Sequence, residues 1–173
     1  MHLSRLHDRC QLIIPAWAIL VAIQSLRPCW VERDDPNLLL YHEKVALAIS
    51  EEAEDVDDAA ALISIAKNES GLCQWVQAKK RGPASSAWQL EGKTRLYQGP
   101  FVGLDYEPIH NAAHAAVDVW HHTGGCGNGI AGHFSVYAGG GRCGKDWPSL
   151  RARVSVYWFV YQRITKEIQN GAT

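Results

Sequence analysis

Apolar side chains recur along most of the chain at three- and four-residue spacing, which places them on one face of a helix. Proline and glycine mark where these segments begin and end. The pattern predicts a mostly α-helical fold. We expect helices over residues 15–26, 37–52, 57–69, 109–122, 130–137 and 148–169.

The segment 57–69 differs from the others because its apolar residues surround almost the whole helix. Asp57 and Asp58 suit its N-terminus, where the helix dipole favours negative charge, and Gly71 suits its end. A helix that is apolar on nearly all sides is normally buried. Its small and branched apolar residues are Ala60, Ala61, Leu62, Ile63, Ile65 and Ala66.

Residues 72–108 show no sustained helical period and contain Gly82-Pro83, Gly92, Gly99-Pro100 and Gly103. Such residues punctuate turns and short elements. We expect an irregular lobe here with room for a small β-hairpin. A stretch this long inside a compact domain is usually functional.

The N-terminal segment allows two interpretations. Arg5 and Arg9 precede an uncharged stretch over 11–26, as in a signal peptide, but no small-residue cleavage site follows. The stretch is also at or below the length that spans a bilayer. We prefer a buried helix beginning at Pro15; a signal or membrane-anchoring segment is the alternative. Residues 1–56 are accordingly expected to hold N-terminal helices packed on, or anchoring, a domain over 57–173.

The chain has 173 residues and a formal net charge of −1, with 47% hydrophobic residues. This length fits one folded domain with one core. A nucleic-acid-binding protein needs a basic footprint, which is not seen here. Seven Trp and six Tyr suit either a sugar-binding cleft or a core.

The five cysteines show no Cys-x-x-Cys spacing of the zinc or redox type. Cys126 and Cys143 flank a glycine-rich segment and are predicted to form a disulfide. Cys10 and Cys29 lie among apolar residues, where buried free thiols are expected.

Glu69 is the main candidate for chemistry. It ends the apolar helix 57–69, where partial desolvation and the negative end of the helix dipole both favour a protonated carboxyl group. A carboxylic acid that keeps its proton near neutral pH can protonate a glycosidic oxygen. A solvent-exposed glutamate at a helix end is the ordinary alternative.

Three further motifs follow Glu69-Ser70 in order. They are Ser86-Ala87-Trp88-Gln89, Tyr137-Ala138-Gly139 and Tyr157 in the last helix. This order resembles the lytic transglycosylases related to goose-type lysozyme, and the resemblance covers about residues 57–164. It implies a lysozyme-like fold.

The resemblance also implies roles. Glu69 would be the acid and then the base, and Ser70 would orient it or the substrate's N-acetyl group. Gln89 would hydrogen-bond the sugar, Tyr137 would position Glu69 or the substrate, and Tyr157 would line the cleft. The chain departs from the family where glycine is expected at Ser86 and asparagine at Ala138.

The implied reaction is cleavage of the bond between N-acetylmuramic acid and N-acetylglucosamine in peptidoglycan, leaving 1,6-anhydromuramic ends and needing no cofactor. The partners would be peptidoglycan strands in the periplasm or cell wall, with association with a phage particle or wall machine as a further expectation. A hydrolytic lysozyme of the same fold and a non-catalytic structural or wall-binding module are the alternatives.

The sequence also contains residues for two other chemistries. His110, His114 and His121 share a helix and could bind zinc, but the metalloprotease glutamate is replaced by Asn111. We therefore expect ordinary surface or core histidines and no metal. A hydrolytic enzyme usually needs a second carboxylate. The candidates are Glu91, Asp105 and Glu107.

Overall fold

The protein is described here from a computed structural model, over residues 13–74, 84–91, 105–123, 129–139 and 148–172. These residues are mostly helical, and every helix predicted from the apolar pattern is present. The largest shift is at the fourth predicted helix, which begins at Tyr106 instead of 109. The helices are α1 (Ala16–Ser25), α2 (Pro36–Glu52), α3 (Val56–Ser70), α5 (Tyr106–His122), α6 (Gly129–Gly139) and α7 (Pro148–Gly171), with a short 3-10 turn, η1 (Trp30–Glu32).

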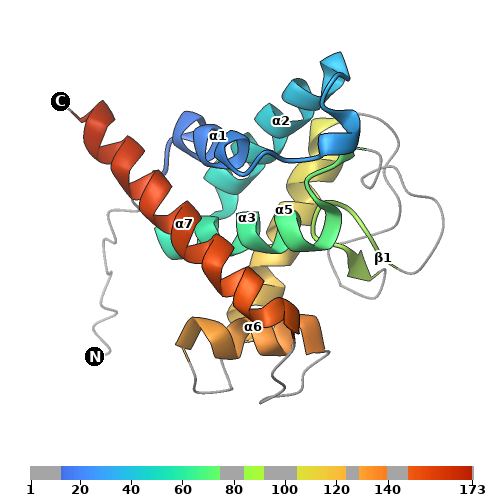
Figure 1. The fold of residues 1–173 in the computed structure, drawn as a ribbon, viewed down its shortest axis with the longest axis vertical. Coiled ribbons are helices and arrows are strands. Elements are labelled where there is room, and N and C mark those ends of the chain that lie inside the picture. The colour runs from blue at the N-terminus through green and yellow to red at the C-terminus, as the bar shows by residue number, and fades with distance from the viewer. Residues whose placement is uncertain (1–12, 75–83, 92–104, 124–128, 140–147, 173) are drawn as a thin grey trace, which may run out of the picture.

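Helix α3 lies at the centre, behind α7 and in front of α5 (Figure 1). Asp55 caps its N-terminus by accepting a hydrogen bond from the backbone N–H of Asp58. Gly71 ends it in the left-handed conformation that glycine adopts most readily. Its middle is fully buried, as its nearly all-apolar sequence predicts.

The N-terminal helices share one core with the rest of the protein. Pro15 stands at the N-cap of α1, and α1 packs on α2 and on the C-terminal helix α7. Buried residues of α1, such as Ile19 and Ile23, belong to the same cluster as those of α3 and α7. Among the described helices, none has the length and apolar character needed to cross a membrane.

A disulfide joins Cys29, just before η1, to Cys73, just after α3. The prediction of a free thiol at Cys29 is therefore wrong, although the residue is buried. Its partner lies 44 positions away, a pairing that sequence spacing does not reveal. Cys10, Cys126 and Cys143 lie outside the described residues, as does their predicted chemistry.

The described part of the irregular lobe forms a tight turn between two short strands. β1 (Ala84–Ser85) pairs antiparallel with β2 (Leu90–Glu91), with Ser85 opposite Leu90. Trp88, inside the turn, is fully buried and donates its indole N–H to the carbonyl of Leu62 in α3, at 3.0 Å. This bond fastens the turn to the central helix.

Candidate active site around Glu69

Glu69 lies one residue before the end of α3, with 25% of its side chain exposed. The preceding turns of α3 are held against α7, because the buried Ser64 hydroxyl donates to the backbone carbonyl of Arg153 at 2.8 Å. The carboxyl group therefore stands at the edge of the core on a fixed helix, where it is reachable from solvent.

Arg153 is the charged partner of Glu69. Its Nη2 lies 2.8 Å from Glu69 Oε1, and only 9% of the arginine side chain is exposed. The guanidinium fixes the direction of the carboxyl group through this contact. Arg153 is a residue of the candidate site that the sequence motifs do not reveal.

The guanidinium of Arg153 is only partly satisfied. Its Nε and Nη1 are buried and make no hydrogen bond. Buried polar groups are normally paired, and an unpaired one costs about 1–3 kcal/mol. The stability of the fold alone therefore does not explain a buried arginine at this position beside Glu69.

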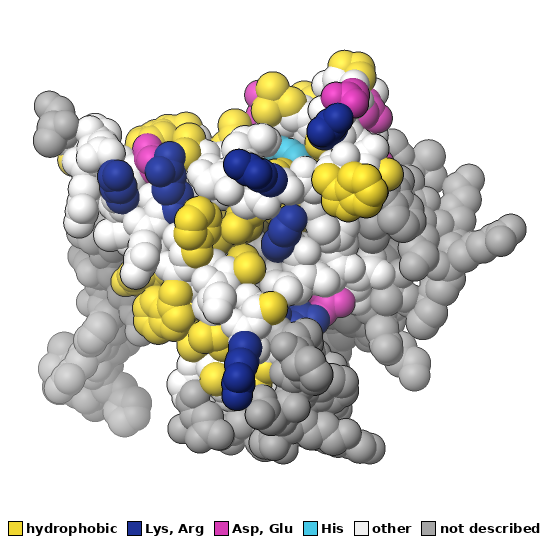
Figure 2. All heavy atoms as spheres, in the orientation of Figure 1, with side chains coloured by type: hydrophobic (Ala, Val, Ile, Leu, Met, Phe, Trp, Pro, Cys, Tyr) yellow, Lys and Arg dark blue, Asp and Glu magenta, His cyan; other side chains and the backbone are white. Residues whose placement is uncertain are grey.

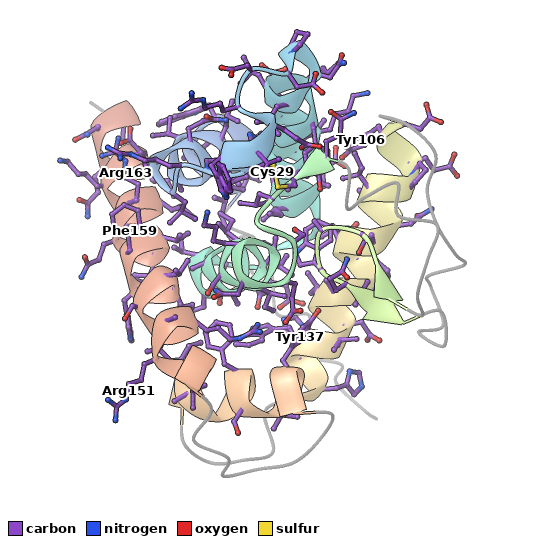
Figure 3. All side chains as sticks on the ribbon, turned by 45° about the vertical axis from the view of Figure 1, so that its right-hand side comes forward. Cys29, Tyr106, Tyr137, Arg151, Phe159 and Arg163 are labelled. Atoms are coloured by element: carbon purple, nitrogen blue, oxygen red, sulfur yellow. A yellow bond between two sulfur atoms is a disulfide. The ribbon has the colours of Figure 1, made fainter. Side chains whose placement is uncertain are left out.

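Tyr137 of α6 is the second group at Glu69, and Figure 3 shows it between α6 and α3. Its hydroxyl donates to the backbone carbonyl of Trp88 at 3.1 Å. Burial and then the negative charge of Glu69 raise the pKa of Tyr137, while Arg153 lowers it. The phenol stays protonated at neutral pH and lies within the electrostatic reach of both charged groups.

The turn 86–89, which carries Gln89, contacts Tyr137 through the carbonyl of Trp88. Ser86 has φ 73°, the left-handed conformation that favours glycine, and it is fully buried. The backbone N–H of Gln89 donates to the Ser86 carbonyl at 3.2 Å, and its side-chain amide donates to the same oxygen at 3.0 Å. Since Tyr137 bonds Trp88, Gln89 is one residue from the Tyr137 contact.

Ser70 serves the end of α3 instead of the Glu69 carboxyl group. Its hydroxyl donates to the carbonyl of Ala66 at 2.8 Å and accepts from the N–H of Leu72 at 3.1 Å. Both contacts are local backbone contacts, so the expected orientation of Glu69 by this hydroxyl is not seen. The described contacts of Ser70 shape the turn that follows Glu69.

That turn is tied to the N-terminal helices at two further points. His42 of α2 lies 2.9 Å from the Leu72 carbonyl through Nε2, and its Nδ1 lies 2.9 Å from the amide of Gln24. The backbone N–H of Cys29 donates to the Gly71 carbonyl at 2.9 Å, beside the Cys29–Cys73 disulfide. The segment after Glu69 is thus held by His42, by the backbone of Cys29 and by the Cys29–Cys73 disulfide.

Tyr157 lies away from Glu69, which corrects the expectation that it lines the cleft there. Its hydroxyl donates to Asp57, in the first turn of α3, and the residue is 1% exposed. Glu69 is roughly 18 Å further along the helix. Tyr157 instead packs edge-on against Phe134, and Arg153, one turn earlier on α7, occupies the position facing Glu69.

The candidate second carboxylates that the structure describes stand elsewhere. Asp105 is the N-cap of α5 and Glu107 is in its first turn. Tyr106 between them donates to Glu51, at the end of α2, near the opposite end of α3 from Glu69. The side chain of Glu91 is outside the described part.

The three histidines of α5 that could have bound zinc pair with carboxylates. His110 lies 2.7 Å from Glu52, His114 contacts the same carboxylate, and His121 lies 2.9 Å from Asp58. These contacts fasten α5 to α2 and α3. Within the described ranges, the one grouping with metal-ligand spacing is Cys29, Glu32 and Cys73, whose sulfur atoms are joined to each other.

One open depression of about 550 Å³ is lined by residues between α5 and α6. Its lining does not include Glu69, Arg153 or Tyr137. Its walls are Asp118, Val119, His122, Thr123 and Val136.

Comparison of the chain with protein-family models, with curated proteins and with solved structures finds no match. The geometry around Glu69 is therefore the basis for inferring a function. It combines a partly exposed carboxyl group with a buried guanidinium and a phenol. The phenol bonds a turn that carries an amide side chain. Such a set can donate and accept one proton and can hydrogen-bond a polar substrate.

Proposed function

We propose that the protein is a peptidoglycan lytic transglycosylase with a lysozyme-like fold, whose single catalytic carboxyl group belongs to Glu69. The observation that carries this proposal is that Tyr137 hydrogen-bonds the turn 86–89 and lies within electrostatic reach of Glu69. These motifs are far apart in the chain, and they are the ones on which the resemblance to that family rests.

The conformation of Ser86 supports the same proposal. The family pattern has glycine at this position, and Ser86 adopts a positive φ that glycine favours. The chain therefore keeps the backbone shape for which the glycine is needed. The Ser86 hydroxyl accepts a hydrogen bond from the N–H of Trp88 at 3.3 Å, which helps to hold this shape.

In the proposed reaction, protonated Glu69 gives its proton to the glycosidic oxygen while the bond from C1 of N-acetylmuramic acid breaks. The substrate's own acetamido oxygen bonds to C1 and shields the positive charge. The Glu69 carboxylate then takes the proton of the muramic 6-hydroxyl as that oxygen attacks C1 and releases the acetamide. The sugar ends as a 1,6-anhydro ring, and no water is consumed.

Arg153 and Tyr137 have defined tasks in this scheme. The guanidinium stabilises the carboxylate that forms once Glu69 has given up its proton, and it fixes the direction of the carboxyl group. The Tyr137 hydroxyl links α6 to the turn that carries Gln89, which holds the amide near the substrate. Among the described residues, the charged side chain that contacts Glu69 is Arg153, and this favours a one-carboxylate mechanism over a hydrolytic one.

A disulfide between Cys29 and Cys73 agrees with action outside the reducing cytoplasm, where peptidoglycan lies. The proposed location is accordingly the periplasm or cell wall.

The experiment is a zymogram and a turbidity assay on purified peptidoglycan with wild type, Glu69→Gln and Glu43→Gln. Glutamine keeps the shape of Glu69 but cannot donate the proton, so clearing should fall by about two to four orders of magnitude. Glu43 is an exposed residue of α2 and serves as the matched control, which should clear like wild type. A well-folded Glu69→Gln protein that clears at the wild-type rate would remove Glu69 from the reaction.

A non-catalytic wall-binding module gives a different result in the same assay. It would bind purified peptidoglycan without clearing it, and Glu69→Gln would bind equally well.

A further inference from the structure

The outer side of α7 carries aromatic and basic residues together. Trp158 is 47% exposed and Phe159 is 46% exposed, well above what a core-facing aromatic shows. At 100° per residue, these two residues, Arg151 and Lys166 fall within an arc of about 100°. Figure 3 shows Arg151 and Phe159 pointing away from the body of the protein.

The charge of α7 is strongly one-sided. The helix contains Arg151, Arg153, Arg163 and Lys166 but a single acid, Glu167, which pairs with Arg163 at 3.1 Å. Arg153 faces inward to Glu69. Arg151 and Lys166 are both exposed, so the outer face is positive although the whole chain has a net charge of −1.

The same character extends beyond α7. Figure 2 shows Lys and Arg side chains interleaved with hydrophobic ones across this face, with few acids among them. Helix α1, which packs on α7, adds Trp17 with 46% exposure, and its ring lies against Gly171 at the end of α7. The acids gather instead on α2 and α5: Glu43, Glu51, Glu52, Glu107 and Asp118.

We propose that this face, formed by α7 and the start of α1, binds the surface of an anionic lipid bilayer. Trp and Phe place their rings at the level of the lipid headgroups, while Arg and Lys extend to the phosphates. α7 has 24 residues and is roughly 36 Å long, enough to lie along such a surface.

The arrangement of aromatic rings and cations on this face favours a bilayer. The described depression is lined by residues of neither α7 nor α1. The rings of Trp158 and Tyr161 also pack edge-on at 5.7 Å, so these aromatics form a ridge on the helix. A ridge with flanking cations fits a flat charged surface.

The test is sedimentation of the full chain with vesicles of phosphatidylcholine alone, and of phosphatidylcholine containing on the order of one third phosphatidylglycerol. Wild type should bind the anionic vesicles at low salt and lose most of this binding at high salt. Lys166→Gln and Arg151→Gln should each weaken binding about fivefold, and Phe159→Ser about tenfold. Leu47→Ser, at an α2 site with 41% exposure, is the apolar control and should bind like wild type.

Equal binding to both kinds of vesicle, no binding to either, or wild-type binding by the Arg151, Phe159 and Lys166 variants would overturn the proposal. Binding to purified peptidoglycan or heparin without binding to vesicles would also overturn it, because the partner would then be an anionic polymer. If Phe159→Ser does not fold, the two surface charge variants decide the outcome. Glu69→Gln should bind vesicles like wild type, so this result is independent of the proposed catalysis.

Discussion

At the scale of single residues, Arg153 holds the carboxyl group of Glu69 in its orientation through a direct contact. Replacing it by Met removes the ion pair and also removes the two buried donors that make no hydrogen bond. These effects oppose each other, so we expect the free energy of unfolding to stay within about 1 kcal/mol of wild type. The rate of peptidoglycan cleavage should nevertheless fall by about tenfold to a hundredfold, because the carboxyl group loses its orientation.

Chemical denaturation and initial clearing rates would measure both effects. Arg153→Lys keeps the charge and should recover part of the rate, whereas a purely structural residue would show no such rescue. Arg151→Met, two residues away and exposed, is the matched control. A cleavage rate unchanged in a folded Arg153→Met protein would contradict the positioning role.

His42 links stability to pH. Burial lowers its pKa below the usual 6.5, the nearby charge of Lys67 lowers it further, and the bond to the Leu72 carbonyl opposes both. The neutral ring fits its place, with a proton on Nε2 for Leu72 and a lone pair on Nδ1 for the Gln24 amide. Since the folded pKa lies below the unfolded one, its contribution is complete above pH 6.5 and is lost as the pH falls through the folded value.

We therefore expect wild type to lose more stability than His42→Gln between about pH 7.5 and about pH 5, measured by urea denaturation at each pH. His122→Gln, at an exposed position, should lose as much as wild type. An equal loss in wild type and His42→Gln would exclude His42 as the source.

Sequence alone singles out some residues of the candidate site and misses others for physical reasons. Glu69 could be found because its motif is local: an apolar helix, an acid and a glycine within a few positions. Arg153 could not, because its place depends on how α7 crosses α3, a contact between Ser64 and Arg153 across 89 positions. Because α7 crosses α3 in this way, Tyr157 contacts Asp57 at the other end of α3.

At the level of elements, the Cys29–Cys73 disulfide joins the connection after α1 to the connection after α3. A bridge across 44 positions restricts the unfolded chain and should stabilise the fold by about 4 kcal/mol on the loop-entropy estimate. The double variant Cys29→Ser, Cys73→Ser should lose about this much in chemical denaturation.

The loss of the bridge should also lower the cleavage rate, because the turn after Glu69 is held through the Cys29–Gly71 bond. Wild type treated with a thiol reductant should match the double variant, and the double variant should not respond to the reductant. A free energy of unfolding that does not change on removal of both sulfur atoms would contradict the estimate.

The helices could be predicted because each is set by a local apolar period and local end signals. Asp55, Pro36 and Gly71 stand at helix ends as capping rules require. The turn 86–89 had no such signal: Ser86 takes a glycine-like conformation without being glycine. It is stabilised by contacts to α3 and α6, made by Trp88, which only the folded chain provides.

At the scale of the whole molecule, the central helix α3 carries Glu69 near its end and α7 brings Arg153 into contact with it. Tyr137 of α6 lies within electrostatic reach of Glu69 and bonds the turn that carries Gln89. The order of these motifs along the chain is readable from sequence, but their meeting depends on the packing of α3 against α7 and on Trp88. A proton donor assembled in this way from four segments is the central claim of our account.

The most direct test is mass spectrometry of the fragments released from purified peptidoglycan by wild type and by Glu69→Gln. If Glu69 serves as acid and then base with the muramic 6-hydroxyl as nucleophile, wild type releases fragments with 1,6-anhydromuramic ends, about 18 mass units lighter than reducing ends. The Glu69→Gln protein should release almost none. Reducing ends as the main wild-type product, or anhydro ends in equal yield from Glu69→Gln, would contradict the account.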